Sequence, residues 1–411
     1  MKPISSSLFG LLCFSVWINY IDRGTLSVAA PVLRPELGIS PSQMGILLSG
    51  FFWTYALLQP GIGYLVDRFG AYRLYAAGYA VWSIAVALGG MSTGFGTLLA
   101  SRLLLGAGES VAYPCFSRII STGFAENRRG IANAMIDVGT KVGPALGTFL
   151  GGMLINTYGW RPFFFWMGAA SLLWLVPWVK MIPKDEPLLV KSGDPAQVPM
   201  SKLLRQWNPW VTFLGLFGFN YAFYFLLTWL PSYLVNERKY TMEKMAIIGA
   251  LPFCATAVSA ILTAMYADRK IAAGAPAADT RRRLLTIGLV IAGTTLFGAT
   301  LESQGWAMVC MIVAFAGLGM FTANCWAITQ TLCSINSVGA WTGCQNCVGN
   351  MGGVVAPILT GVLIQQTGTY AAAFVAAAVV QVESILADRC RALRCFRRAH
   401  RLQARADGHS Q

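Results

Sequence analysis

Four charged residues stand inside two strongly apolar segments of this chain. Asp22 and Arg23 are adjacent in the first apolar run, and Arg102 and Glu109 lie in a later one. A charge at the centre of a membrane span costs roughly 2.5–3.5 kcal/mol on insertion scales, so such residues usually face a polar cavity. A carboxylate there can exchange protons, and a guanidinium group matches the fork of a carboxylate. These residue types predict proton exchange and binding of an organic anion.

The spacing of the four residues predicts how they face one another. Arg102 and Glu109 are two helical turns apart and share a face. Asp22 and Arg23 point about 100° apart, so one can face a partner helix while the other faces the cavity. The alternative for both pairs is a static ion pair that holds helices together.

A third charged pair stands further along the chain. Asp137 and Lys141 have the i, i+4 spacing of a helical ion pair. They could face the cavity, with Lys141 as a second contact for an anion, or they could neutralise each other.

The composition indicates a membrane protein. Hydrophobic residues make up 55% of the chain and charged residues 12%, against about 25% charged residues in a soluble domain. Both histidines lie in the last twelve residues, which leaves none in a span for a metal or haem. Cys344 and Cys347 have metal-like spacing but lack a second pair, so we interpret them as packing residues. No nucleophile–base set or cofactor loop occurs, so we expect no enzyme activity, no cofactor and no metal.

Hydropathy and turn signals predict twelve membrane-spanning helices. They lie near 8–30, 43–65, 72–92, 96–118, 130–155, 160–181, 209–234, 245–266, 283–301, 305–329, 337–364 and 369–386. The polar stretch 182–207 divides them into two six-helix halves. The predicted units are an N-terminal half over 1–181, a cytoplasmic linker over 182–207, a C-terminal half over 208–386 and a basic cytoplasmic tail over 387–411.

The basic residues predict the orientation of the helices. With both termini in the cytoplasm, five of the 31 lysines and arginines fall outside and three lie within spans. The five are Arg34, Arg161, Arg238, Lys239 and Lys244, and the three are Arg23, Arg102 and Lys141. The rest fall in cytoplasmic segments, as the positive-inside rule requires. The net charge of +14 therefore reflects topology, and we expect no nucleic-acid partner.

An Asp-Arg motif follows the second expected helix of each half. Asp67 and Arg68 form the first copy, and Asp268 and Arg269 form the second. With Gly63, Leu65, Gly70 and Arg73, the first copy resembles the loop motif of the major facilitator superfamily. The resemblance implies a two-half transporter fold in which the four motif residues act in gating.

Further motifs resemble those of the anion:cation symporter family, which includes sugar-acid and organic-anion proton symporters. They are Asn19–Arg23, Arg102–Glu109 with Pro114, Gly130–Gly147, Phe225–Leu234 and Asn346–Pro357. The resemblance implies that Asp22 and Glu109 are protonation sites, that Arg102 pairs with Asp22, and that Arg23 binds the substrate carboxylate. Tyr55 resembles a substrate-contacting tyrosine of sugar-acid members, although an aromatic residue in a span could equally pack in the core or against lipid.

The second half offers neutral polar groups in place of buried charges. They are Asn220, Tyr221, Asn324, Gln330, Gln345, Asn346 and Asn350. We expect Tyr221, Asn346 and Asn350 to bind hydroxyls or a second carboxylate of the substrate. The glycines around Asn350 could instead serve only close helix packing.

The end of the chain departs from the family pattern. The last apolar run stops near Val382 and is followed by Glu383, Asp388 and several arginines. That leaves a final span shorter than the ~20 residues a bilayer needs. Either the reading frame or the length is altered near residue 381, or the basic tail binds anionic lipid headgroups.

Together these features predict a proton-coupled importer of a small organic anion that works by alternating access. The expected substrate is a sugar acid, such as an aldonate, a hexuronate or an aldarate. The alternatives are import of dicarboxylates or aromatic carboxylates and export of amphipathic compounds. We expect a monomer in the lipid bilayer of the bacterial inner membrane.

Overall fold

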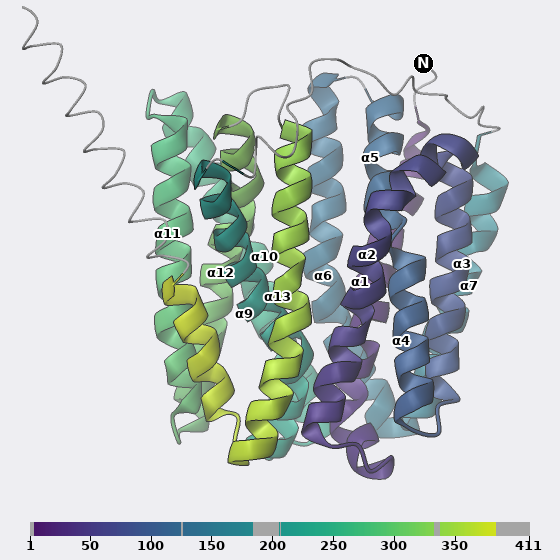
Figure 1. Ribbon diagram of the computed structural model, residues 1–411, viewed down its shortest axis with the longest axis vertical. Helices are drawn as coiled ribbons and strands as arrows, with labels where there is room; N and C mark the ends of the chain where they lie inside the picture. The colour runs from purple at the N-terminus through teal and green to yellow at the C-terminus, as the bar shows by residue number, and fades with distance from the viewer. Residues whose placement is uncertain (1–3, 125, 184–204, 206, 333–337, 384–411) are drawn as a thin grey trace, which may run out of the picture.

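The computed structural model describes residues 4–124, 126–183, 205, 207–332 and 338–383, and these residues form helices and no strand (Figure 1). The helices that precede the expected linker, here called the N-terminal half, are α1 (Ser6–Glu36), α2 (Pro41–Phe69), α3 (Ala71–Gly90), α4 (Phe95–Glu109), α5 (Ala112–Gly123), α6 (Glu126–Tyr158) and α7 (Trp160–Met181). Those that follow it, the C-terminal half, are α9 (Trp207–Ser232) with a π-helical turn (Tyr233–Glu237), α10 (Met242–Ala272), α11 (Ala277–Leu296) with a 3-10 turn (Phe297–Thr300), α12 (Gln304–Leu332), α13 (Val338–Thr367) and a last helix over Ala371–Glu383.

Each of the twelve expected spans coincides with a helical segment. Within the described residues, seven helices are long and apolar enough to cross a membrane by length and composition. Their outer faces expose large apolar side chains such as Leu173, Val258 and Trp306, which a soluble monomer rarely does over a continuous surface. The chain is therefore an all-α, multi-pass membrane protein.

Two parts of the predicted domain organisation fall largely outside the described residues. These are the linker over 182–207 and the basic tail over 387–411. The last described helix runs over Ala371–Glu383, and the residues after it lie outside the described part of the structure, so the shortening of the twelfth helix stays a prediction.

The expected fourth span is not one helix. It is divided into α4 and α5 at Ser110 and Val111. Pro114 explains the break, because it has no N–H to donate to the carbonyl group of Ser110 and its ring crowds that carbonyl. Glu109 is thus the last residue of α4, at the end of a helix instead of its interior.

Successive spans run in opposite directions, and short turns join α1 to α2 and α2 to α3 (Figure 1). We call the end of the bundle where α1 passes into α2 the Arg34 end, and the end where α2 passes into α3 the Arg68 end. Gly70 makes the second turn with a φ of 82°, which only glycine adopts without strain. Both Asp-Arg motifs lie in the last turn of their helices, α2 and α10, at the Arg68 end.

The two halves make hydrogen bonds at the Arg34 end. The Ser27 hydroxyl donates to the carbonyl oxygens of Leu227 at 2.8 Å and Thr228 at 2.7 Å. The Ser49 hydroxyl donates to the Val354 carbonyl at 3.0 Å. These bonds join α1 to α9 and α2 to α13.

Glycines bring the backbones of the two halves into contact at the same end. A Cβ atom added to Gly45 in α2 would collide with the Pro357 carbonyl of α13. One added to Gly152 in α6 would lie 2.5 Å from the Cβ of Ala246 in α10. The conformation is therefore one in which the Arg34 end is closed.

Candidate functional site

Arg23 and Glu109 form a buried ion pair between α1 and α4. The Nη2 and Nε atoms of Arg23 donate to Oε2 of Glu109 at 2.6 Å and 3.1 Å. The two side chains are 5% and 0% exposed. The break after α4 leaves Glu109 at the end of its helix, beside the middle of α1.

Asp22, the residue before Arg23, faces a different helix. Its Oδ2 atom accepts a hydrogen bond from the Ser171 hydroxyl of α7 at 2.7 Å, and its side chain is fully buried. Asp22 and Arg23 thus diverge, as their helical spacing predicted, and Asp22 faces a partner helix; that Arg23 faces a cavity stays a prediction.

The expected pairing of Arg102 with Asp22 is wrong in this conformation. Nη2 of Arg102 donates instead to the backbone carbonyl of Arg23 at 3.4 Å, and Asp22 forms none of the ion pairs found among the described residues. The reason is direction, because Asp22 projects from α1 toward α7 whereas Arg102 reaches α1 from α4.

Three aromatic rings surround the guanidinium group of Arg23. Its carbon Cζ lies 4.6 Å from the ring centroid of Tyr20, 4.5 Å from that of Phe51 and 5.2 Å from that of Tyr55. Each such contact stabilises a desolvated cation by about 0.5–2 kcal/mol. Tyr55 is 3% exposed, so it lies inside the protein beside Arg23 and not against lipid.

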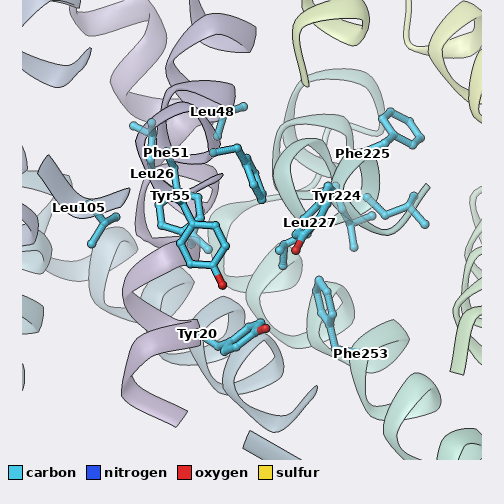
Figure 2. Packing of buried hydrophobic residues seen from close by; sticks show 14 of the residues in the cluster. Tyr20, Leu26, Leu48, Phe51, Tyr55, Leu105, Tyr224, Phe225, Leu227 and Phe253 are labelled. Carbon is cyan, nitrogen blue, oxygen red and sulfur yellow. The ribbon is translucent and has the colours of Figure 1, made fainter. Parts of the chain in front are cut away.

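The C-terminal half faces this group with Tyr224 of α9. The Tyr224 ring lies 4.5 Å from that of Phe52 in α2, and Figure 2 shows Tyr20, Tyr55 and Tyr224 directed toward one another. The tyrosine of α9 predicted to bind the substrate is a different one, Tyr221. Tyr221 is buried with its ring 6.3 Å from Phe217 of the same helix.

The helical periodicity of α9 could have predicted Tyr224. Asn220, Tyr224 and Thr228 recur at every fourth residue and form one stripe of α9. Thr228 meets α1 through Ser27. Tyr224 is the member of this stripe whose ring meets the N-terminal half, at Phe52, whereas Tyr221 lies on the neighbouring stripe.

Two glycines around Asn350 bring α13 against α9. Asn350 is buried and Asn346 is half-buried. A Cβ atom on Gly349 would lie 2.7 Å from the Leu216 side chain, and one on Gly352 would lie 2.7 Å from the backbone nitrogen of Tyr221. Close packing therefore accounts for these two glycines, as the alternative interpretation held. The side chain of Gln330 lies outside the described part of the structure.

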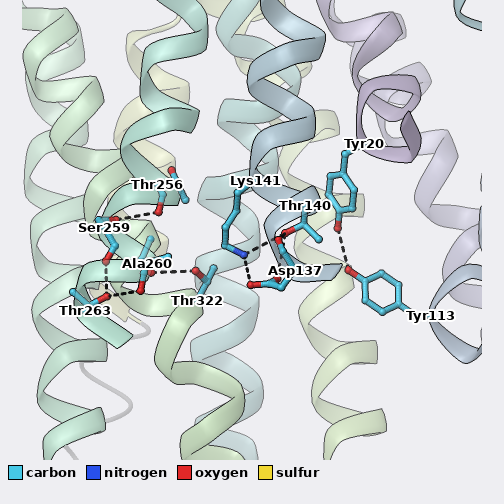
Figure 3. A network of polar contacts seen from close by, with 11 residues as sticks. Tyr20, Tyr113, Asp137, Thr140, Lys141, Thr256, Ser259, Ala260, Thr263 and Thr322 are labelled. Carbon is cyan, nitrogen blue, oxygen red and sulfur yellow. Dashed lines mark hydrogen bonds and ion pairs between the residues drawn. The ribbon is translucent and has the colours of Figure 1, made fainter. Parts of the chain in front are cut away.

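Asp137 and Lys141 bond to each other on α6 (Figure 3). Nζ of Lys141 donates to Oδ2 of Asp137 at 2.6 Å and to the Thr140 hydroxyl at 3.2 Å. The side chain of Lys141 is 10% exposed and that of Asp137 is 60% exposed. This is the neutralising arrangement, and a role for Lys141 toward an anion stays a prediction.

The expected gating residues are exposed where they are described. Arg68, Asp268 and Arg269 are all exposed, and Asp268 accepts a hydrogen bond from Arg281 of α11 at 3.2 Å. The side chain of Asp67 lies outside the described part of the structure. In the described residues, no group of three His, Cys, Asp or Glu side chains could hold a metal ion.

Comparison with known proteins identifies the family of the chain and several transporters that it resembles. Residues 12–334 match the Major Facilitator Superfamily model. The chain is 29% identical to the hexuronate transporter of Bacillus subtilis over 381 residues, which covers 90% of each protein. It is also 29% identical to the D-galactonate transporter of Escherichia coli over 383 residues, or 87% of this chain and 89% of the relative.

A solved structure agrees on the fold. The bacterial homologue of the human lysosomal transporter Spinster superposes with a TM-score of 0.79 over 95% of this chain and 98% of its own, at 20% identity. The two proteins therefore share the same arrangement of helices. With a family model that covers most of its length, this chain belongs to the Major Facilitator Superfamily, a family of transporters and not of enzymes.

Proposed function

We propose that this protein is a proton-coupled importer of a sugar-acid anion that works by alternating access. The observation that carries the proposal is the buried ion pair of Arg23 and Glu109, set among tyrosines where the two halves meet. A buried cation that loses its partner destabilises a protein by about 3–5 kcal/mol. Arg23 therefore needs a carboxylate at all times, either that of Glu109 or that of a substrate.

The balance of buried charges links the proton to the anion. When Asp22 and Glu109 are ionised, they balance Arg23 and Arg102, and all four side chains are buried. A proton on Glu109 leaves one positive charge uncompensated, and a substrate carboxylate supplies the missing negative charge. Proton and anion thus favour each other's binding, which is the requirement for symport.

The relatives support the class of substrate. Hexuronate and D-galactonate, which two relatives are named for, each combine one carboxylate with several hydroxyl groups. Arg23 suits the carboxylate. The hydroxyl groups of Tyr20, Tyr55 and Tyr224 and the amide of Asn350 offer hydrogen bonds for the remaining polar groups. An exporter of amphipathic compounds would not need the buried guanidinium.

The orientation follows from charge. The Arg68 end carries most of the basic residues, so it would face the cytoplasm of a bacterial inner membrane with both termini. The conformation described here, closed at the Arg34 end, would then be closed to the outside. Import would require the glycine contacts of α2 with α13 and of α6 with α10 to separate and reform in each cycle.

Uptake into proteoliposomes tests this function. Purified protein would be reconstituted, and accumulation of labelled D-galactonate and of a labelled hexuronate would be followed with an acidic exterior. We expect accumulation that a protonophore abolishes and that unlabelled sugar acids inhibit more strongly than succinate or benzoate. Accumulation that depends on sodium, or transport of amphipathic compounds with none of sugar acids, would overturn the proposal.

A further inference from the structure

Buried polar atoms without a hydrogen-bond partner gather inside the N-terminal half. Six such atoms lie on α1, α3 and α4: Nδ2 of Asn19, Oδ1 of Asp22, Oη of Tyr79, Nε1 of Trp82, Nε of Arg102 and Oε1 of Glu109. All six residues are buried. An unsatisfied buried donor or acceptor costs about 1–3 kcal/mol, so a cluster of this size needs bridging groups.

The cluster combines donors with acceptors. The free atoms of Asn19, Trp82 and Arg102 can only donate, whereas those of Asp22 and Glu109 can only accept when the carboxyl groups are ionised. Trp82 lies beside Asp22 and Asn19 lies beside Glu109 without reaching hydrogen-bond geometry. Ordered water, which makes about three hydrogen bonds at a buried polar site, satisfies both kinds of group.

Tyr79 is the member of the cluster that both donates and accepts. It lies within electrostatic reach of both Asp22 and Glu109. Its ring stacks on Trp174 at 4.2 Å and lies 4.1 Å from Trp82, and the residue is 0% exposed. The ring is therefore held in place, and the hydroxyl group can rotate between partners on either side.

Tyr75, one turn earlier on α3, has a hydroxyl group that already has a hydrogen-bond partner. Its hydroxyl group lies 2.6 Å from that of Ser15, which in turn donates to the Leu12 carbonyl at 2.6 Å. Tyr75 is equally buried and packs against the same Trp174. It thus provides a matched comparison whose hydroxyl group is already engaged.

We propose that Tyr79 and ordered water relay a proton between Asp22 and Glu109 inside the N-terminal half. In each transfer the Tyr79 oxygen accepts a proton from the side of one carboxyl group while its own proton passes toward the other carboxylate. One proton moves and Tyr79 ends neutral. The inference rests on the proposed proton coupling and adds the route by which the two carboxylates share a proton without opening the surroundings of Arg23.

The charged and titratable groups around this route are arginines and tyrosines. Among the described residues, those that interact with Tyr79, Asp22 or Glu109 are Arg23, Arg102, Tyr55, Tyr75 and Tyr224. The two arginines keep their charge at all working pH values, so the proton exchanged here belongs to the two carboxyl groups.

Replacing Tyr79 with Phe tests the relay, because the change removes one oxygen atom and keeps the stacking on Trp174. We expect Y79F to retain counterflow exchange of sugar acid within about twofold. Its proton-driven uptake should fall about tenfold or more, which is less than the roughly 100- to 10,000-fold that a positioned proton-transfer group contributes to a rate. Y75F should keep both activities near the parental level. A pH-sensitive dye should show that substrate-induced proton uptake is slowed in Y79F and unchanged in Y75F.

Three results would overturn the relay. They are parental proton-driven uptake in Y79F, loss of its counterflow together with uptake, and equal defects in Y79F and Y75F. The second and third would assign these tyrosines to packing. The parent protein and E109Q, measured in the same assay, keep the two proposals apart. If the parent couples to protons and E109Q does not, an unaffected Y79F refutes the relay alone.

Discussion

Arg23 binds Glu109 through a single carboxylate oxygen. Both donors of Arg23 converge on Oε2, at 2.6 Å and 3.1 Å, and Oε1 has no hydrogen-bond partner. A parallel two-oxygen fork, the stronger arrangement for this pair of groups, is not formed. Oε1 is thus the atom on which a proton can arrive before the contact with Arg23 is lost.

Glu109→Gln should separate exchange from accumulation. The amide is neutral, like the protonated acid, and its oxygen can still accept from Arg23. We expect the variant to bind sugar acid and exchange it in counterflow, yet fail to concentrate it under a pH gradient.

Asp22→Asn should give the same separation if Asp22 is the second proton site. Paired counterflow and pH-driven uptake in proteoliposomes measure both effects. Normal pH-driven accumulation by both neutral variants would exclude carboxylate coupling.

Arg23→Lys should weaken substrate binding by about 1.5–3 kcal/mol, the range of a charge-assisted hydrogen bond. Lysine keeps the charge but loses the planar fork and its stacking among the rings of Tyr20, Phe51 and Tyr55. Isothermal titration with a sugar acid would measure the change. Lys180→Arg, at the end of α7, serves as a control for a basic exchange away from the site. Parental affinity in the lysine variant would remove Arg23 from the binding site.

Asp67→Asn should slow transport and leave substrate affinity within about threefold, or less than 1 kcal/mol. Asp67 lies in the last turn of α2, where the helix dipole disfavours a carboxylate. Such a residue fits a role in one conformation of the cycle better than a role in stability. Glu243→Gln, an exposed change in the first turn of α10, should leave transport unchanged. Loss of affinity with intact folding would place Asp67 in the binding site.

Gly45→Ala should disfavour closure of the Arg34 end. The added methyl group collides with the Pro357 carbonyl, and overpacking of this kind costs about 1–3 kcal/mol. Gly61→Ala on the same helix meets nothing within 4 Å and should have no effect. Labelling of a cysteine introduced at Ser42, which faces Gln365 of α13, would report the difference. Equal labelling in the two variants would mean that this contact does not control closure.

Hydropathy predicted every span because a bilayer demands long apolar helices, but it could not predict where a helix breaks. Pro114 was part of a recognised motif, yet its effect falls one turn earlier, at the carbonyl of Ser110. The placement of Glu109 at the end of α4 depends on that break. The angular spacing of Asp22 and Arg23 predicted their divergence because it depends on helix geometry alone.

Partners across helices were harder to predict than directions within one helix. The pairing of Arg102 with the Arg23 carbonyl depends on how α1 and α4 pack, which the spacing of residues in either helix does not contain. Tyr224 was missed for a different reason. It shares a helix face with Asn220 because it lies one turn onward, whereas the predicted Tyr221 is adjacent to Asn220 in sequence and lies on another face.

The glycine contacts at the Arg34 end also bear on how the cell conserves energy. Where backbone meets backbone, as at Gly45 and Gly152, little room remains for a file of water molecules, and the hydroxyls of Ser27 and Ser49 donate to carbonyl groups. Protons pass through proteins along chains of water and polar groups. Contacts of this kind would block proton leak through the closed end, so the transporter could wait between substrates without dissipating the proton gradient.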